Sequence, residues 1–176
     1  MGPLPAEGRD EPMTELELRR ATEAFGRAAA AGTVSARELH DFQLGLQWDV
    51  FGGPASERRE DIDANDPRVQ AILDALEALS LIEPGDPSHP WSRANVLQAL
   101  GRHSEAAKDH VLATERFDEE DARADGPTGD EADWAADARL HAARSFALAG
   151  EPVAAQSLLP RLDAAGRAEV EPLLQG

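Results

Sequence analysis

The chain has 176 residues, of which 41% are hydrophobic, so it can bury a core and is too apolar to be disordered throughout. Its 34 acidic and 17 basic side chains give a formal net charge of −17, which repels nucleic-acid phosphates and anionic membrane surfaces. No basic patch offsets this charge, so we expect neither nucleic acid nor a membrane as a partner. We expect a protein or peptide partner, and the negative charge favours a basic one. The absence of cysteine excludes disulfides, thiolate metal sites and cysteine nucleophiles.

The apolar residues are mostly Ala and Leu, Val and Ile are sparse, and no alternating strand pattern occurs. Because β-branched residues favour strands and unbranched ones favour helices, this composition predicts an all-α fold. Neither a signal-peptide pattern nor an apolar run of transmembrane length is visible, so we expect a cytoplasmic location.

Residues 1–12 are predicted to form a flexible tail, and residues 13–83 an N-terminal helical region. Thr14 and Ser35 are each followed three residues later by Glu, and this pattern predicts two capping boxes that begin helices. Asp66, followed by Pro, predicts the start of a third helix. The segment 61–66 also resembles a calcium loop, but it lacks the Gly and the bidentate Glu that such a loop needs.

Residues 84–176 are predicted to form helical hairpins, roughly at 91–117 and 131–162, with a short final helix near 167–174. Pro160 should kink the last long helix, because it lacks the amide that a helix interior requires. The segment 118–133 between the hairpins holds eight acids and one Arg. Charge runs of this kind are usually solvated loops, so we interpret it as an acidic insertion.

The two hairpins share a pattern of apolar residues and glycine at the same offsets. A small residue, a large apolar residue, a Gly and a second Ala recur, as Ala94, Leu97, Gly101 and Ala106 in the first and as Ala143, Phe146, Gly150 and Ala155 in the second. Small residues let two helices approach closely, and Gly lets the backbone turn between them.

This pattern resembles the tetratricopeptide repeat. The resemblance implies antiparallel helix hairpins stacked as a short right-handed superhelix. The sequence departs from the family where its Trp is expected, because Pro90 and Arg139 stand there. The two glycines are 49 residues apart, so the acidic segment would be an insertion. The N-terminal helices do not keep the register, since Arg37 occupies the Ala site if Gly32 is the turn glycine; they are either degenerate repeats or a separate cap.

The resemblance also implies a concave face lined by the first helix of each hairpin. By repeat position this face holds Trp91, Asn95, Gln98, Asp137, Leu140 and Arg144. We expect apolar anchoring near Trp91 and Leu140 and orientation by the polar groups, as in a non-enzymatic scaffold or adaptor module that binds a peptide or protein segment. No catalytic residue, metal site or cofactor is expected. His110, at an apolar repeat site, is expected to be a packed and hydrogen-bonded core residue.

Two alternatives remain open. The first is an enzyme or small-ligand-binding protein with a pocket between the N-terminal helices and the repeats, lined by Trp48, Phe51 and histidines. The second is a homodimer that buries the apolar excess of the second helix, namely Leu44, Trp48 and Phe51. A short helical array leaves end faces to cover, which favours self-association.

Overall fold

The computed structural model of the protein describes residues 14–33, 35–53, 55, 61–123 and 134–176. These residues form helices and connecting turns without any β-strand, which confirms the all-α prediction. The predicted tail at 1–12 lies outside the described residues. The chain divides into two compact units, an N-terminal unit of residues 1–54 with 62–83 and a C-terminal unit of residues 55–61 with 84–176.

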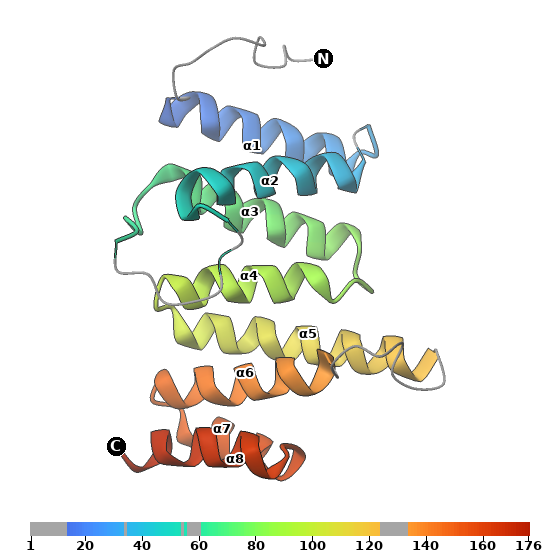
Figure 1. The fold of residues 1–176 in the computed structure, drawn as a ribbon. Helices are drawn as coiled ribbons and strands as arrows, with labels where there is room; N and C mark the ends of the chain where they lie inside the picture. The colour runs from blue at the N-terminus through green and yellow to red at the C-terminus, as the bar shows by residue number, and fades with distance from the viewer. Residues whose placement is uncertain (1–13, 34, 54, 56–60, 124–133) are drawn as a thin grey trace. The chain divides into compact units, whose positions relative to one another are not determined.

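The described residues of the N-terminal unit form three helices, α1 (Glu15–Ala30), α2 (Ala36–Phe51) and α3 (Pro67–Ile82). Helix α3 packs against both α1 and α2 (Figure 1). The buried apolar side chains come from all three helices and include Leu18, Leu39, Leu46, Ile72, Leu76 and Leu79. Leu and Ile at helical spacing therefore build this unit by burying one face of each helix.

Side-chain caps begin all three helices, as the sequence predicts. The Thr14 amide donates to the Glu17 carboxylate at 3.0 Å, and the Glu17 amide donates back to the Thr14 hydroxyl at 3.2 Å. Ser35 and Glu38 form the same reciprocal pair at the start of α2. Asp66 accepts a hydrogen bond from the backbone amide of the second residue of α3. Each cap satisfies an amide that would have no partner in the first turn.

The C-terminal unit contains five α-helices and two 3₁₀ turns among its described residues. They are α4 (Ser88–Ala99), α5 (His103–Arg123), α6 (Trp134–Leu148), α7 (Pro152–Leu158), η1 (Leu159–Arg161), α8 (Ala164–Val170) and η2 (Glu171–Gln175). Helix α5 packs against α4 on one side and α6 on the other, and α7 and α8 both pack against α6 (Figure 1). Among the described residues of both units, no helix has the length and apolar character needed to cross a bilayer.

The first part of the acidic segment is helical and does not form the predicted loop. Helix α5 continues to Arg123, so residues 118–123 of the predicted insertion at 118–133 are helical, and residues 124–133 lie outside the described ones. The Asp118 carboxylate lies 3.2 Å from an Arg139 nitrogen and 3.6 Å from an Arg161 nitrogen. These two cations, from α6 and η1, offset part of the charge repulsion at the start of the segment.

The helix ends after Pro84 also differ from the predicted ones. Helix α4 begins at Ser88 instead of near Trp91, and the Ser88 amide donates to the Asp86 carboxylate at 2.8 Å. Helix α7 ends at Leu158, and Pro160 lies in the following 3₁₀ turn, so the predicted kinked helix is two separate elements. The final helix starts at Ala164, where Asp163 caps it.

Candidate functional site

The two hairpins of the C-terminal unit turn with the same backbone geometry. Gly101 and Gly150 both have a φ of 74°, a left-handed conformation that residues with a Cβ avoid. In each turn the residue after the glycine donates its amide to a carbonyl five residues earlier, Arg102 to Leu97 and Glu151 to Phe146, both at 2.9 Å. The sequence repeat is therefore also a repeat of turn structure.

The small residues of the repeat are fully buried in both hairpins. Ala94 and Ala143 in the first helices, and Ala106 and Ala155 in the second, all have zero exposure. The N-terminal unit has a similar turn at Gly32 but an exposed Arg37 where these hairpins bury Ala. A buried Ala at this repeat position is thus shared by the two C-terminal hairpins and not by the N-terminal turn.

Three aromatic rings from three helices meet in the C-terminal unit. Trp91 of α4 stands edge-on to His110 of α5 and to His141 of α6, with ring centroids 5.4 and 5.3 Å apart. The two imidazoles are themselves 5.2 Å apart, with a tilt of 30° between their planes. We call these three residues the three-ring contact. Through Trp91 and His141 it joins the first helices of the two hairpins by their side chains, beside α5.

The aromatic cluster continues beyond the three-ring contact. Phe117 lies 6.3 Å from Trp91 in an edge-on arrangement, and Trp134 stacks on Phe117 at 6.3 Å. Trp134 is 45% exposed, whereas Trp91 is partly buried. An aromatic path therefore runs from the interior of the unit to its surface at the start of α6.

His110 is packed as the sequence predicts, but the predicted hydrogen bonds are absent. Its side chain has no exposure, and neither ring nitrogen has a hydrogen-bond partner among the described residues. Burial lowers the pKa of His110 to about 3, and the neighbouring His141 acts in the same direction. The ring is therefore neutral at physiological pH.

His141 was not singled out by the sequence analysis, although it lies next to Leu140, which was. Its Nδ1 atom is buried and has no hydrogen-bond partner in the described part of the chain. Burial lowers the pKa of His141, Arg144 adds to this effect, and Asp137 and Glu169 oppose it. Its ring neighbours, Trp91 and His110, come from other helices, so the sequence around His141 gave no signal for this contact.

The six residues predicted to line a concave face differ in accessibility. Trp91 and Asn95 are partly buried on α4, Gln98 is buried, and Asp137 is exposed at the start of α6. The Asn95 amide and the Asp137 carboxylate make no side-chain hydrogen bond or ion pair with the described residues, and the Gln98 Oε1 atom is buried without a partner. Asn95 and Asp137, with Trp91, remain the candidates for contact with another molecule, whereas the Gln98 side chain is buried.

The other two predicted residues contact the C-terminal segment of the chain. Leu140 is half-buried and packs on the cluster formed by Ala143, Leu162 and Val170. An Arg144 nitrogen lies 3.6 Å from the Glu169 carboxylate of α8. Leu140 therefore contributes to the core, and Arg144 already has an acidic neighbour.

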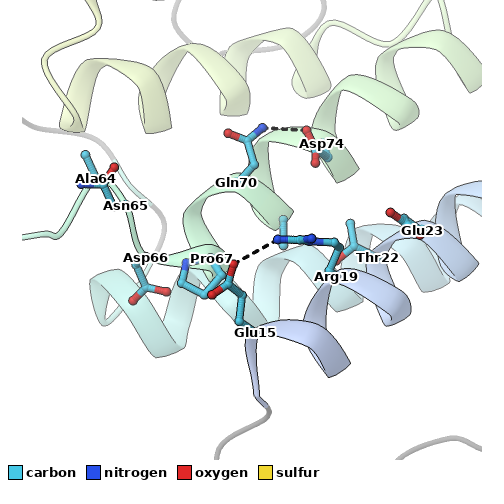
Figure 2. Close-up of a pocket in the computed structure, with 11 residues that line it drawn as sticks. Glu15, Arg19, Thr22, Glu23, Ala64, Asn65, Asp66, Pro67, Gln70 and Asp74 are labelled. Atoms are coloured by element: carbon cyan, nitrogen blue, oxygen red, sulfur yellow. Dashed lines mark hydrogen bonds and ion pairs between the residues drawn. The ribbon is translucent and has the colours of Figure 1, made fainter.

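A pocket of about 440 Å³ lies in the N-terminal unit, between α1, α3 and the turn that precedes α3. Figure 2 shows its lining, which is mostly polar, with Glu15 and Arg19 on α1 facing Gln70 and Asp74 on α3.

Each acidic group on the wall of this pocket has a nearby donor. Glu15 pairs with Arg19 at 3.1 Å, Asp74 accepts from Gln70 at 2.8 Å, Asp66 pairs with Arg68 at 2.6 Å and Glu23 lies 4.0 Å from Arg27. These internal pairs account for the polar lining without a ligand.

The residues of the two alternatives lie on α2. Leu44 is half-buried, Trp48 is 56% exposed and Phe51 is buried. A single exposed tryptophan is common on protein surfaces and does not by itself indicate an interface.

The Asp86 carboxylate and His89 form the acid–histidine pair nearest to a metal-ligand arrangement in the C-terminal unit, with 3.6 Å between Oδ2 and Nε2. The same carboxylate accepts hydrogen bonds from the amide and the hydroxyl of Ser88, at 2.8 and 2.6 Å. These local hydrogen bonds to Ser88 account for the position of the Asp86 carboxylate.

Comparisons of the chain with protein-family models, with curated proteins and with solved structures give no match. The resemblance to the tetratricopeptide repeat stays a prediction that depends on the residues named above.

Proposed function

We propose that the protein is a non-enzymatic interaction module, similar to the tetratricopeptide repeat, that binds a peptide or protein segment along α4 and α6. The observation that carries the proposal is the direct contact of Trp91 with His141, which joins the first helices of two hairpins that repeat in sequence and in turn geometry. In repeat proteins of this kind, adjacent first helices form the surface that holds the partner.

The polar groups on these helices suit an extended segment. The Asn95 amide can both donate to and accept from a peptide backbone, and the Asp137 carboxylate can accept from a basic side chain. Both groups lack a side-chain partner within the described residues, so a ligand would not have to break an existing bond. The net charge of −17 favours a basic segment and increases its association rate.

A library of random peptides tests the proposal without knowledge of the natural partner. The purified full chain is used to select peptides at neutral pH and physiological salt, and affinities of the selected peptides are measured by fluorescence anisotropy. We expect selected peptides to be enriched in Lys and Arg, and we expect an Asn95→Ala/Asp137→Asn double variant to bind them at least tenfold more weakly.

A matched charge control separates the surface from the overall charge. Glu115 is exposed on α5, and Glu115→Gln removes the same charge as Asp137→Asn. We expect this control to bind selected peptides as the wild type does. An equal loss of affinity in both variants, or a double variant that binds like the wild type, would show that the α4–α6 surface is not the binding site.

A further inference from the structure

The three-ring contact holds two titratable rings where a proton cannot be accommodated. A protonated imidazole carries two N–H donors, and both need an acceptor when the ring is buried. His110 has no exposure and no hydrogen-bond partner at either nitrogen among the described residues, and its nearest titratable neighbour is a second histidine 5.2 Å away. Charge on His110 would therefore be both desolvated and placed against His141.

The charged groups around the contact do not neutralise such a proton. Between α4 and α5, Arg93 and Asp109 already pair with each other at 2.7 Å. On α6, Arg144 disfavours charge on His141 while Asp137 favours it, and on α8 Glu169 also favours it but lies 3.6 Å from Arg144. Among the charged and titratable groups of the described residues, only His141 acts on His110.

We propose that the three-ring contact is an acid-sensitive junction, at which α4 and α6 separate from α5 as the surroundings become acidic. His110 can take up a proton only when water reaches its ring, and water reaches it only when the packing of Trp91 and His141 opens. Acid therefore favours the open arrangement of the C-terminal unit. This inference is independent of any partner and of the proposed function.

The size of the effect follows from linkage. The pKa of His110 is about 3 in the closed arrangement and its ordinary value is 6.5, so the open arrangement binds one more proton between these two values. Stability of the closed arrangement is complete above pH 6.5 and falls as the pH decreases. From pH 6.5 to about 4.5 the opening constant rises about 50-fold from His110 alone.

Amide hydrogen exchange measures this opening directly. Opening constants for amides of α4, α5 and α6, corrected for intrinsic exchange, are compared at pH 6.5 and 4.5 in the full chain. We expect a rise of about 50-fold or more in the wild type. The variant His110→Phe keeps an aromatic ring and removes the titration. We expect its opening constant to rise by a factor at least ten times smaller than that of the wild type over the same pH range. His103→Phe, at the start of the same helix, should keep the wild-type response.

The proposal is overturned if His110→Phe keeps the wild-type response, or if the wild type shows no such rise. If His110→Phe does not fold, the pH titration of the His110 ring carbon by NMR in the wild type decides the matter. We expect no titration of the closed form between pH 7.5 and 4.5; a midpoint near the ordinary histidine value in the closed form would overturn the proposal.

Discussion

Gly101 and Gly150 lie at the turns of two consecutive helical hairpins and adopt the same left-handed conformation, each with a φ of 74°. The residue after each glycine closes the turn through an amide bond of 2.9 Å to the carbonyl five residues earlier. This arrangement satisfies the last carbonyls of the first helix and starts the second helix in the antiparallel direction. The repeat is therefore built from a local backbone rule that acts twice.

Replacement of the turn glycine should destabilise the C-terminal unit. No atom lies within 4 Å of a Cβ added at Gly150, so Gly150→Ala meets only the strain of a positive φ. We expect a loss of about 1–2 kcal/mol in the free energy of unfolding, measured with urea.

Gly45 is a control for Gly150, because the same substitution there brings no strain from a positive φ. It lies inside α2, and a Cβ added there also meets open space. Gly45→Ala should therefore stabilise the chain by about 0.5–1 kcal/mol, because Ala loses less backbone entropy in a helix. A Gly150→Ala variant as stable as the wild type would contradict the expected strain.

Enlargement of a buried repeat alanine should disrupt helix packing. Ala106 is fully buried on α5, so Ala106→Leu must displace neighbouring side chains. We expect a cost of about 1–3 kcal/mol, seen as a lower thermal midpoint by circular dichroism. Ala168→Leu on the exposed side of α8 should change the midpoint little. Equal effects at both sites would mean that Ala106 does not set the helix separation.

The ion pair between Arg93 and Asp109 should contribute more than a surface pair of the same length. Both Arg93–Asp109 and Arg102–Glu105 have nitrogen–oxygen distances of 2.7 Å, but the side chains of the first are 22% and 15% exposed and those of the second 41% and 46%. Arg93→Met leaves a half-buried carboxylate without its arginine, at a cost of about 1–3 kcal/mol.

The matched variant Arg102→Met should cost less than about 1 kcal/mol, because solvent screens the surface pair. Urea unfolding of both variants at the same salt concentration makes the comparison. If the two losses are equal, burial does not strengthen the Arg93–Asp109 pair.

Asp66 should link stability to acidic pH. The hydrogen bond from the Arg68 side chain lowers the pKa of the Asp66 carboxyl below its ordinary 3.8, against the opposing effect of burial. Since the folded pKa is the lower one, the stabilisation is present above 3.8 and is lost as the pH falls through the folded pKa. The Asp66→Asn variant keeps a helix cap but loses the charge, so its deficit in unfolding free energy relative to the wild type should shrink between about pH 6 and about pH 2.5. A deficit that does not change with pH would exclude the ion pair as its source.

Local features of this protein follow from its sequence alone. Thr14, Ser35 and Asp66 predict helix starts because a cap depends only on residues within one turn. Gly101 and Gly150 predict the hairpin turns for the same reason, since a positive φ is a property of one residue. The all-α class follows from composition, which acts at every position through side-chain entropy.

Other features depend on residues far apart in the chain and follow from the packing of helices. Asp118, the first residue of the acidic run, lies on a helix and meets Arg139 and Arg161 from later elements. Leu140 joins the core because α8 packs on α6, and His110 faces His141 because α5 and α6 are neighbours. Sequence periodicity gives the face of a helix on which a residue lies, but the neighbour that covers that face, and hence the burial and protonation of a side chain, is set by packing between helices.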